Sequence, residues 1–262
     1  MELLLVVVAV LGLAIGSFLN VVIYRVPAGH SVVAPASHCP RCDTPIRNRH
    51  NVPVLGWLLL RGRCADCAAP ISARYPLIEL ATGAAFVLVA WRLYSIDRLA
   101  GLPAWLYFTA MAIALAAIDI ECHRLPNAIV LPSYPVLALL LAAPLLWQHD
   151  YWALLRTAIG CAALFGSYLA LALAYPKGMG FGDVKLAGLV GAMLGWLSWA
   201  ALLVGAFAAF LLGGVAGIAV IASRRGTGKT PLPFGPFMLA GAALALYLAQ
   251  PILDSYLRVT GL

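Results

Sequence analysis

Charged residues are scarce in this chain. It has 10 acidic and 17 basic residues among 262, so only 10% of it is charged, whereas 63% is hydrophobic. An average soluble domain is about one quarter charged. The shortage of charge therefore excludes an ordinary soluble protein, and the mean hydropathy of +0.96 is typical of a chain that crosses a membrane several times.

Other familiar signals are also missing. The first apolar run, from Leu3 to Tyr24, has no basic segment before it and no clear cleavage site, so we expect it to stay in the protein as a helix. There is no internal repeat and no low-complexity tail, and no segment shows the alternation of a strand. A glycine-rich nucleotide loop of the soluble type is absent, which excludes a Rossmann domain.

What the chain does have is a series of apolar runs near the roughly 20 residues that cross a bilayer as helix. We expect an all-α polytopic membrane protein, with a bundle of about eight transmembrane helices and a cytoplasmic zinc-binding loop domain. The division would be a first helix at 1–24, the loop domain at 25–75 and the remaining bundle at 76–262. The expected spans are 3–24, 76–93, 103–121, 127–147, 152–175, 184–198, 199–221 and 234–257, of which the sixth is short.

The basic residues predict the orientation. With the N-terminus outside, in the periplasm, thirteen of the 17 Lys and Arg residues fall on the inner side and four on the outer side, as the positive-inside rule requires. The net charge of +7 is then a topology signal spread over the loops, so we expect contact with membrane lipid and none with nucleic acid. The inner set is Arg25, Arg41, Arg47, Arg49, Arg61, Arg63, Arg74, Arg124, Lys177, Lys185, Arg224, Arg225 and Lys229.

The long loop at 25–75 carries two CxxC pairs, "CPRC" at 39–42 and "CADC" at 64–67, separated by 21 residues. Four thiolates at this spacing fit a tetrahedral zinc site, slightly beyond the usual separation. Thiols on the cytoplasmic side stay reduced, which favours zinc over disulfides. We expect Cys39, Cys42, Cys64 and Cys67 to bind one zinc ion and to stabilise a loop with few apolar residues of its own.

Four acidic residues lie within or beside the spans: Glu79, Asp119, Glu121 and Asp183. Carboxylates at membrane depth are costly and are candidates for function. Glu121 is two residues from Asp119, about 200° around a helix, so the two cannot share a face. Asp183 ends the glycine-rich stretch "GMGFGD", which a simple helix-end charge would not require.

The predicted topology places Asp119 and Asp183 at the same depth, on different helices. Two neighbouring carboxylates share one proton, so one activates a water as base while the other donates to a carbonyl. This is the chemistry of an aspartic protease. A proton relay in a proton-coupled transporter uses the same residue types, and the spacing does not decide between them.

Several blocks together resemble the bacterial prepilin peptidase family, whose members share the "GxGD" signature with presenilin-like intramembrane aspartic proteases. The similarity extends over nearly the whole chain. It rests on "GSFLNVVIYRVP" at 16–27, the paired CxxC loop, "YPLIELATG" at 75–83, "DIECHRLPN" at 119–127, "GMGFGDVK" at 178–185 and "PFGPF" at 233–237.

The resemblance implies a bifunctional enzyme of the bacterial inner membrane. It would remove the leader of type IV prepilins or type II secretion pseudopilins at the cytoplasmic face, with Asp119 and Asp183 as catalytic residues, and then methylate the new N-terminal amine with S-adenosylmethionine. For binding of the methyl donor, the candidates are Glu79, Ser17, Asn20 and Arg25, and helix–helix hydrogen bonding is an equal alternative for Ser17 and Asn20. A peptidase without methyl transfer also remains open, as does the oligomeric state.

Overall fold

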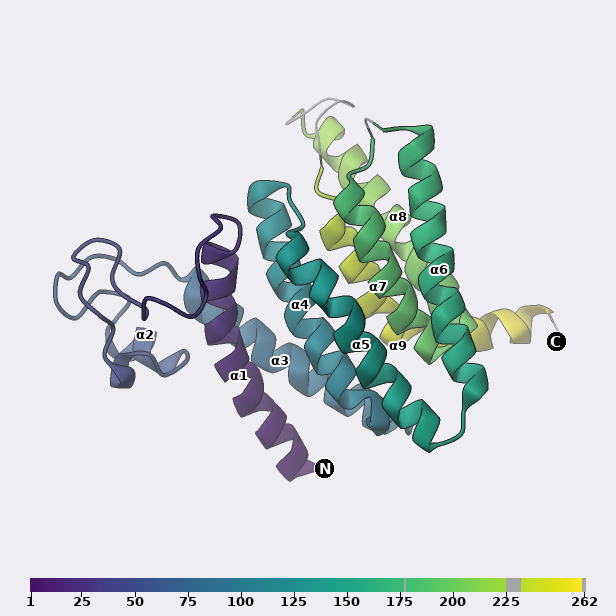
Figure 1. The fold of residues 1–262 in the computed structure, drawn as a ribbon, viewed down its shortest axis with the longest axis horizontal. Helices are drawn as coiled ribbons and strands as arrows, with labels where there is room; N and C mark the ends of the chain where they lie inside the picture. The colour runs from purple at the N-terminus through teal and green to yellow at the C-terminus, as the bar shows by residue number, and fades with distance from the viewer. Residues whose placement is uncertain (177, 225–231, 261–262) are drawn as a thin grey trace. The chain divides into compact units, whose positions relative to one another are not determined.

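The computed structural model describes residues 1–176, 178–224 and 232–260, and the part it describes is almost entirely helical (Figure 1). Lys177, Arg225 and Lys229, which belong to the predicted inner set, lie outside the described residues. The long helices are α1 (Glu2–Arg25), α3 (Arg74–Ser95), α4 (Leu102–Cys122), α5 (Asn127–Trp147), α6 (Tyr151–Ala174), α7 (Phe181–Leu197), α8 (Trp199–Ala222) and α9 (Gly235–Thr260).

The eight expected spans all appear as helices, with ends that differ by a few residues. Within the described ranges, seven helices are long and apolar enough to cross a membrane. The exception is α7, at 17 residues, or about 25 Å at 1.5 Å per residue. It begins at Phe181, three residues before the predicted start, so Asp183 lies inside its first turn and not in front of it.

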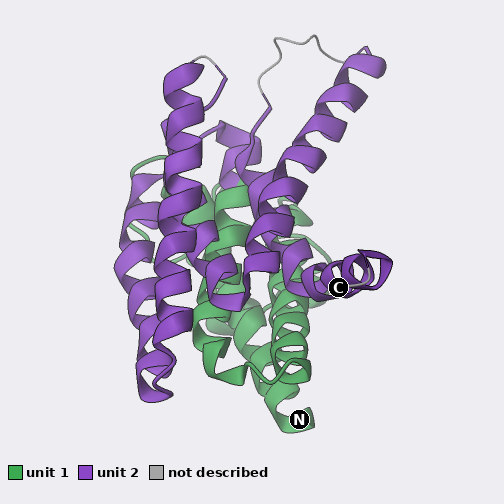
Figure 2. Ribbon diagram, turned by 90° about the vertical axis from the view of Figure 1, so that its right-hand side faces the viewer, with its two compact units in different colours: residues 1–117 green, residues 118–262 purple. Residues whose placement is uncertain are grey.

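The chain separates into two compact units, residues 1–117 and 118–262, with the boundary inside α4 (Figure 2). In the first unit α1 packs closely on α3. A Cβ added at Gly12 would lie 2.8 Å from Cα of Gly83, and one added at Gly16 would lie 2.7 Å from Cα of Glu79. Gly12 and Gly16 form a small-xxx-small pair that lets the two helices approach closely, because no larger side chain fits there.

In the second unit α7 is the central helix, with most of its residues buried. It packs against α6 where Gly160 faces Gly191 and Gly195 so closely that a Cβ at these positions would meet backbone of the other helix. Arg156 of α6 donates to the carbonyl oxygens of Gly195 (2.6 Å), Trp196 (2.9 Å) and Leu197 (3.2 Å). An arginine thereby satisfies the carbonyls that end this short helix.

The loop between α1 and α3 contains two short elements that the sequence did not predict, η1 (Asn48–His50) and α2 (Leu55–Leu59). A third, η2 (Leu99–Gly101), precedes α4. The Trp57 indole donates to the carbonyl of Ile71 (3.0 Å), which ties α2 to the segment that enters α3. Few side chains of the loop are buried, so a staple is needed to order it.

Candidate active site and metal centre

Asp119 lies in the last turn of α4, at the start of the second unit. Its side chain is only 5% exposed, and its Oδ2 atom has no hydrogen-bond partner among the described residues. Glu121 is exposed on the other side of the helix, as the 200° rotation predicted. A buried carboxylate oxygen without a partner costs folding free energy, which fits a group kept available for a reaction.

Asp183 occupies the third position of α7, where it also caps the helix. Its Oδ2 accepts a hydrogen bond from the backbone N–H of Gly180 (3.2 Å), the residue that precedes the helix in extended conformation. An acidic side chain is favoured at this end of a helix dipole. The carboxylate is half-buried, so this bond fixes its position beside the bundle.

The two aspartates are brought together by backbone that approaches closely. A Cβ added at Gly235 would lie 2.8 Å from Oδ2 of Asp119 and 3.4 Å from Leu125, and one added at Gly182 would lie 3.0 Å from Leu125. Leu125 therefore packs between the start of α7 and the start of α9, and the carboxyl groups of Asp119 and Asp183 are near enough to interact electrostatically. Three blocks that are far apart in sequence meet at one end of this unit.

An aromatic cluster adjoins this centre and was not predicted. Tyr168 is 2% exposed, and its ring centroid lies 5.5 Å from that of Phe210 and 6.1 Å from that of Phe234. Phe234 directly precedes Gly235, whose backbone approaches Asp119, so the cluster lies beside this centre. A tyrosine within the apolar part of α6 was the available signal, but the sequence does not say which neighbour it would face.

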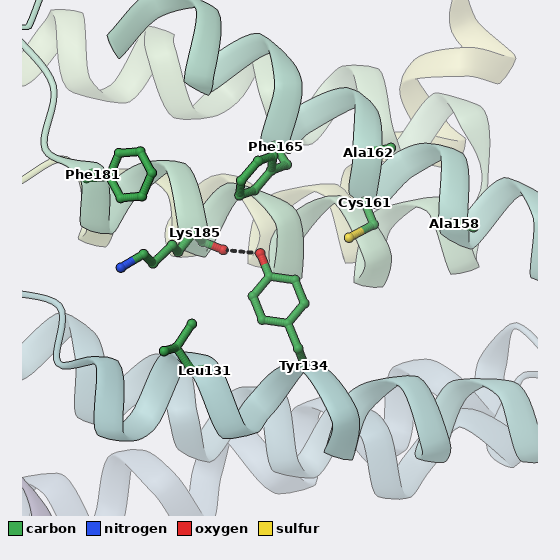
Figure 3. A pocket seen from close by; sticks show the side chains of 8 residues that line it. All are labelled: Leu131, Tyr134, Ala158, Cys161, Ala162, Phe165, Phe181 and Lys185. Atoms are coloured by element: carbon green, nitrogen blue, oxygen red, sulfur yellow. Dashed lines mark hydrogen bonds between the residues drawn. The ribbon is translucent and has the colours of Figure 1, made fainter. Parts of the chain in front are cut away.

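A pocket of about 540 Å³ lies between α5, α6 and α7 (Figure 3). At one end Lys185 donates to the side chain of Asn127 (2.9 Å) and lies 5.1 Å from the centre of the Phe181 ring. The Tyr134 hydroxyl donates to the Lys185 carbonyl (2.7 Å). The remaining lining is apolar apart from Cys161, so the pocket suits a hydrocarbon group better than a polar ligand.

The four cysteines of the loop converge as predicted. Their sulfur atoms all lie within 4.8 Å of one another, and Sγ of Cys39 lies 3.8 Å from Sγ of Cys67. A Zn–S bond of about 2.3 Å in a tetrahedron gives S···S distances of about 3.8 Å. The spacing is far longer than a disulfide bond, about 2.05 Å. The cluster therefore fits a tetrahedral ion with four thiolate ligands.

The two CxxC pairs have the same pattern of backbone hydrogen bonds. This local repeat was not predicted from the sequence. In the first, the N–H of Cys39 donates to Thr44 (3.0 Å) and that of Asp43 to Cys39 (2.9 Å). In the second, the corresponding bonds join Cys64 to Ala69 (2.8 Å) and Ala68 to Cys64 (3.0 Å). Each turn closes with an isolated β-bridge, His38 to Pro45 and Arg63 to Pro70. The repeat presents both thiol pairs in the same way.

The thiol of Cys42 is prepared for metal binding. Hydrogen bonds from the side chain and then the backbone of Thr44 lower the pKa of Cys42 to about 6. Backbone hydrogen bonds from Cys67 and Asp66 also lower the pKa of Cys64. The thiolate is the form that binds metal, so the hydrogen bonds of the turns favour the binding form of Cys42 and Cys64, whereas desolvation and the neighbouring thiols raise the pKa of Cys67 to about 12.

The four candidates for methyl transfer all lie in the first unit, at or near the loop end of α1 and α3. Asn20 donates to the carbonyl of Tyr75 (3.1 Å) and Arg25 to that of Ser31 (3.1 Å). Glu79 is 7% exposed and accepts a hydrogen bond from the backbone N–H of Val54 (2.7 Å). Asn20 and Glu79 thus belong to one packed region, whereas Arg25 holds the chain that leaves α1 and Ser17 is half-buried on α1.

Val54 is a residue whose role the sequence did not reveal. It has φ of 61° and ψ of −51°, a conformation that is strained for a β-branched side chain. The hydrogen bond to Glu79 is one interaction that holds it there. Glu79 therefore joins the loop to α3.

Comparison with known proteins agrees with this arrangement. The profile of the bacterial Peptidase A24 N-terminal domain matches residues 10–93, and that of the type IV leader peptidase family matches residues 106–218. The chain belongs to the type IV leader peptidase family. Proteins named prepilin leader peptidase/N-methyltransferase are similar to it in Stutzerimonas stutzeri (36% identity, 95% of this chain and 92% of the relative) and Pseudomonas putida (35%, 96% and 93%). The protein of that name from Aeromonas hydrophila is 36% identical over 94% of this chain and 91% of its own length.

No solved structure matches the chain. Each of the two matched regions of this leader peptidase contains one of its two candidate sites. The N-terminal region contains the four cysteines, Asn20 and Glu79, whereas the region at 106–218 contains Asp119 and Asp183. Gly235, whose backbone approaches Asp119, lies after both regions.

Proposed function

We propose that this leader peptidase is a bifunctional enzyme that removes the leader of a type IV prepilin or type II secretion pseudopilin and then methylates the new N-terminal amine with S-adenosylmethionine. The names of its relatives support both activities. For the peptidase, the observation that carries the proposal is the buried, partnerless Oδ2 of Asp119 beside the backbone of Gly235, with Asp183 close by.

In the proposed cleavage, one carboxylate of the pair is ionised and the other is protonated. The ionised group takes a proton from a water molecule, and the water oxygen bonds to the scissile carbonyl carbon. The protonated group donates to the carbonyl oxygen, which becomes a hydroxyl. Collapse of the tetrahedral intermediate breaks the C–N bond, the nitrogen receives a proton, and an acid and a free amine leave. Either aspartate could fill either role, since the pair shares one proton.

Replacement of either aspartate by asparagine tests the cleavage site. Asp119→Asn and Asp183→Asn should each lower the rate of leader cleavage by at least about 10²-fold, because general acid–base catalysis contributes that much. Asparagine also accepts at a helix N-terminus, so the cap on Gly180 is kept. Methylation of a previously cleaved peptide, measured by mass, should continue in both variants. Normal cleavage by either variant would contradict the assignment.

For methyl transfer we propose Glu79 as the anionic residue, with Asn20, Ser17 and Arg25 around it. S-adenosylmethionine supplies a methyl group on a cationic sulfonium, which the free amine of the cleaved peptide accepts with loss of a proton. The fit rests on Glu79: one of its oxygens, Oε2, is held by Val54, and the carboxylate is buried where it can attract a cation. Asn20 fixes the Tyr75 carbonyl one turn before Glu79.

Glu79→Gln separates the two activities. The amide has the same size and can still accept from Val54, but it has no charge, so methylation should fall more than cleavage. Both products are measured by mass from one prepilin at equal enzyme concentration, with labelled S-adenosylmethionine as methyl donor. Equal loss of the two activities would assign Glu79 to folding, and unchanged methylation would remove it from the site. If the wild-type enzyme cleaves the leader but transfers no labelled methyl group, it is a peptidase without methyltransferase activity.

The proposed setting is the bacterial inner membrane, with the N-terminus in the periplasm and the aspartates at the cytoplasmic face. The end of α4, the start of α5, the end of α6 and the start of α7 lie at one end of the second unit (Figure 1), which is the end where Asp119 and Asp183 are found. Zinc on the four cysteines is proposed as structural, since four protein ligands leave no open position for water.

A further inference from the structure

The short helix α2 presents leucines to the surroundings. The exposed fractions are 57% for Leu55, 55% for Leu58 and 76% for Leu59. The loop has other exposed apolar residues, such as Val33 and Ile46, but on α2 three leucines lie on one face of a single helical turn. The leucines belong neither to the aspartate pair, nor to the cysteine cluster, nor to the methyl-transfer candidates around Glu79, so none of the proposed sites accounts for them.

The start of α2 is held beside α3, further along that helix than the end from which the loop enters it. The N–H of Val54 bonds to Glu79, which is five residues into α3 and so about 7.5 Å along its axis. Glu79 in turn packs on Gly16, nine residues before the end of α1. In Figure 1, α2 lies lower than the end of α1 from which the loop starts. Leu55, which follows Val54, therefore lies beside the second turn of α3, inside the predicted span at 76–93.

Contacts on one side of α2 hold this helix in place, so its leucines stay on the exposed side. The Trp57 indole bonds to Ile71, and its ring packs on Gly62, where a Cβ would lie 2.8 Å from it. Gly56 lies against the backbone of His50 without room for a side chain. These contacts bury one side of α2 and leave the side with Leu55, Leu58 and Leu59 exposed.

Positive charge follows directly on the leucines. Arg61 and Arg63 are exposed after the end of α2, and within 26–73 five arginines stand against two aspartates. One of the five, Arg47, is paired with Asp66 at 2.9 Å. Leucines next to arginines are the pattern of a segment that lies in a membrane surface rich in anionic lipid.

We propose that α2 is a membrane contact of the loop, with Leu55, Leu58 and Leu59 inserted into the leaflet beside α1 and α3 and Arg61 and Arg63 on the phosphates of anionic phospholipids. The loop is attached at both ends to spanning helices, and Glu79 holds α2 at interfacial depth, so lipid is the first partner that the leucines meet. This contact would fix the cysteine cluster relative to the membrane surface.

The test uses the full chain in nanodiscs of equal phosphatidylglycerol and phosphatidylcholine. Leu59 is replaced by the photo-crosslinker p-benzoylphenylalanine, and adducts are identified by mass after illumination. Phospholipid adducts are expected. Leu55→Gln together with Leu58→Gln in this background should reduce them severalfold. The matched control is Val33→Gln with Ile46→Gln, which changes two exposed apolar residues of the same loop away from α2 and should leave them unchanged.

The role of Arg61 and Arg63 is tested by comparing how often each of the two phospholipids is crosslinked. Phosphatidylglycerol adducts should exceed phosphatidylcholine adducts by roughly fivefold or more, as one arginine near an anionic surface implies. Arg61→Gln with Arg63→Gln should bring the ratio close to one, whereas Arg41→Gln should not. Zinc content and cleavage rate verify that each variant is folded. Adducts to protein instead of lipid would overturn the membrane contact, and a wild-type ratio of one would overturn the anionic surface.

Discussion

Gly235→Ala should damage the peptidase without unfolding it. A Cβ at this position would lie 2.8 Å from Oδ2 of Asp119, whereas ordinary contacts begin at 3.4 Å. The carboxylate must then move by about 0.6 Å, the difference between these two distances. Because a misplacement of about 1 Å costs roughly 10²-fold in rate, we expect cleavage to fall at least about tenfold.

The fold should tolerate the change, since the atom that must move is the end of a side chain and alanine favours helix over glycine. The assay is the initial rate of cleavage of a purified prepilin, compared as kcat/KM. Methylation of a previously cleaved peptide and zinc content should stay at wild-type values. Gly166→Ala and Gly214→Ala are matched controls, because no atom lies within 4 Å of a Cβ at either position. Cleavage by Gly235→Ala within twofold of wild type would refute the close approach to Asp119.

Three further predictions concern parts of the chain away from the aspartates. Cys39→Ser with Cys64→Ser should reduce bound zinc, measured by atomic emission, from about one per chain to near zero and increase proteolysis within 26–73. In the wild type, zinc affinity should begin to weaken as the pH falls through about 6, the pKa of the metal-free Cys42 thiol, because protons then compete for its thiolate. Zinc-free wild type with full activity would contradict this. Arg156→Ala should destabilise the protein by about 3 kcal/mol, from two short charge-assisted bonds of about 1.5 kcal/mol each, with Arg156→Lys intermediate. The measurement is thermal unfolding in detergent, and an unchanged Tm for Arg156→Ala would disprove the role of this cap.

The sequence by itself determined the parts that depend on local pattern. Apolar length predicted the eight long helices, because a helix in lipid must satisfy its own backbone. The spacing of Cys39, Cys42, Cys64 and Cys67 predicted a four-thiolate cluster, because only a few geometries join two CxxC turns to one ion. Helix rotation also separated Asp119 from Glu121. The roles of Asp119 and Asp183, and those of Glu79, Ser17, Asn20 and Arg25, stay predictions until the variants are measured.

The tertiary structure alone decided which surfaces meet. That Gly235 closes on Asp119, that Arg156 ends α7 and that Val54 binds Glu79 could not be read from hydropathy, since all helix faces in a membrane protein are apolar and periodicity does not identify partners. The start of α7 was misplaced by three residues because a glycine-rich stretch predicts a break, whereas Gly182 lies inside the helix and makes room for Leu125. Such contacts are set by packing between segments far apart in the chain, and a single sequence carries no direct record of those distances.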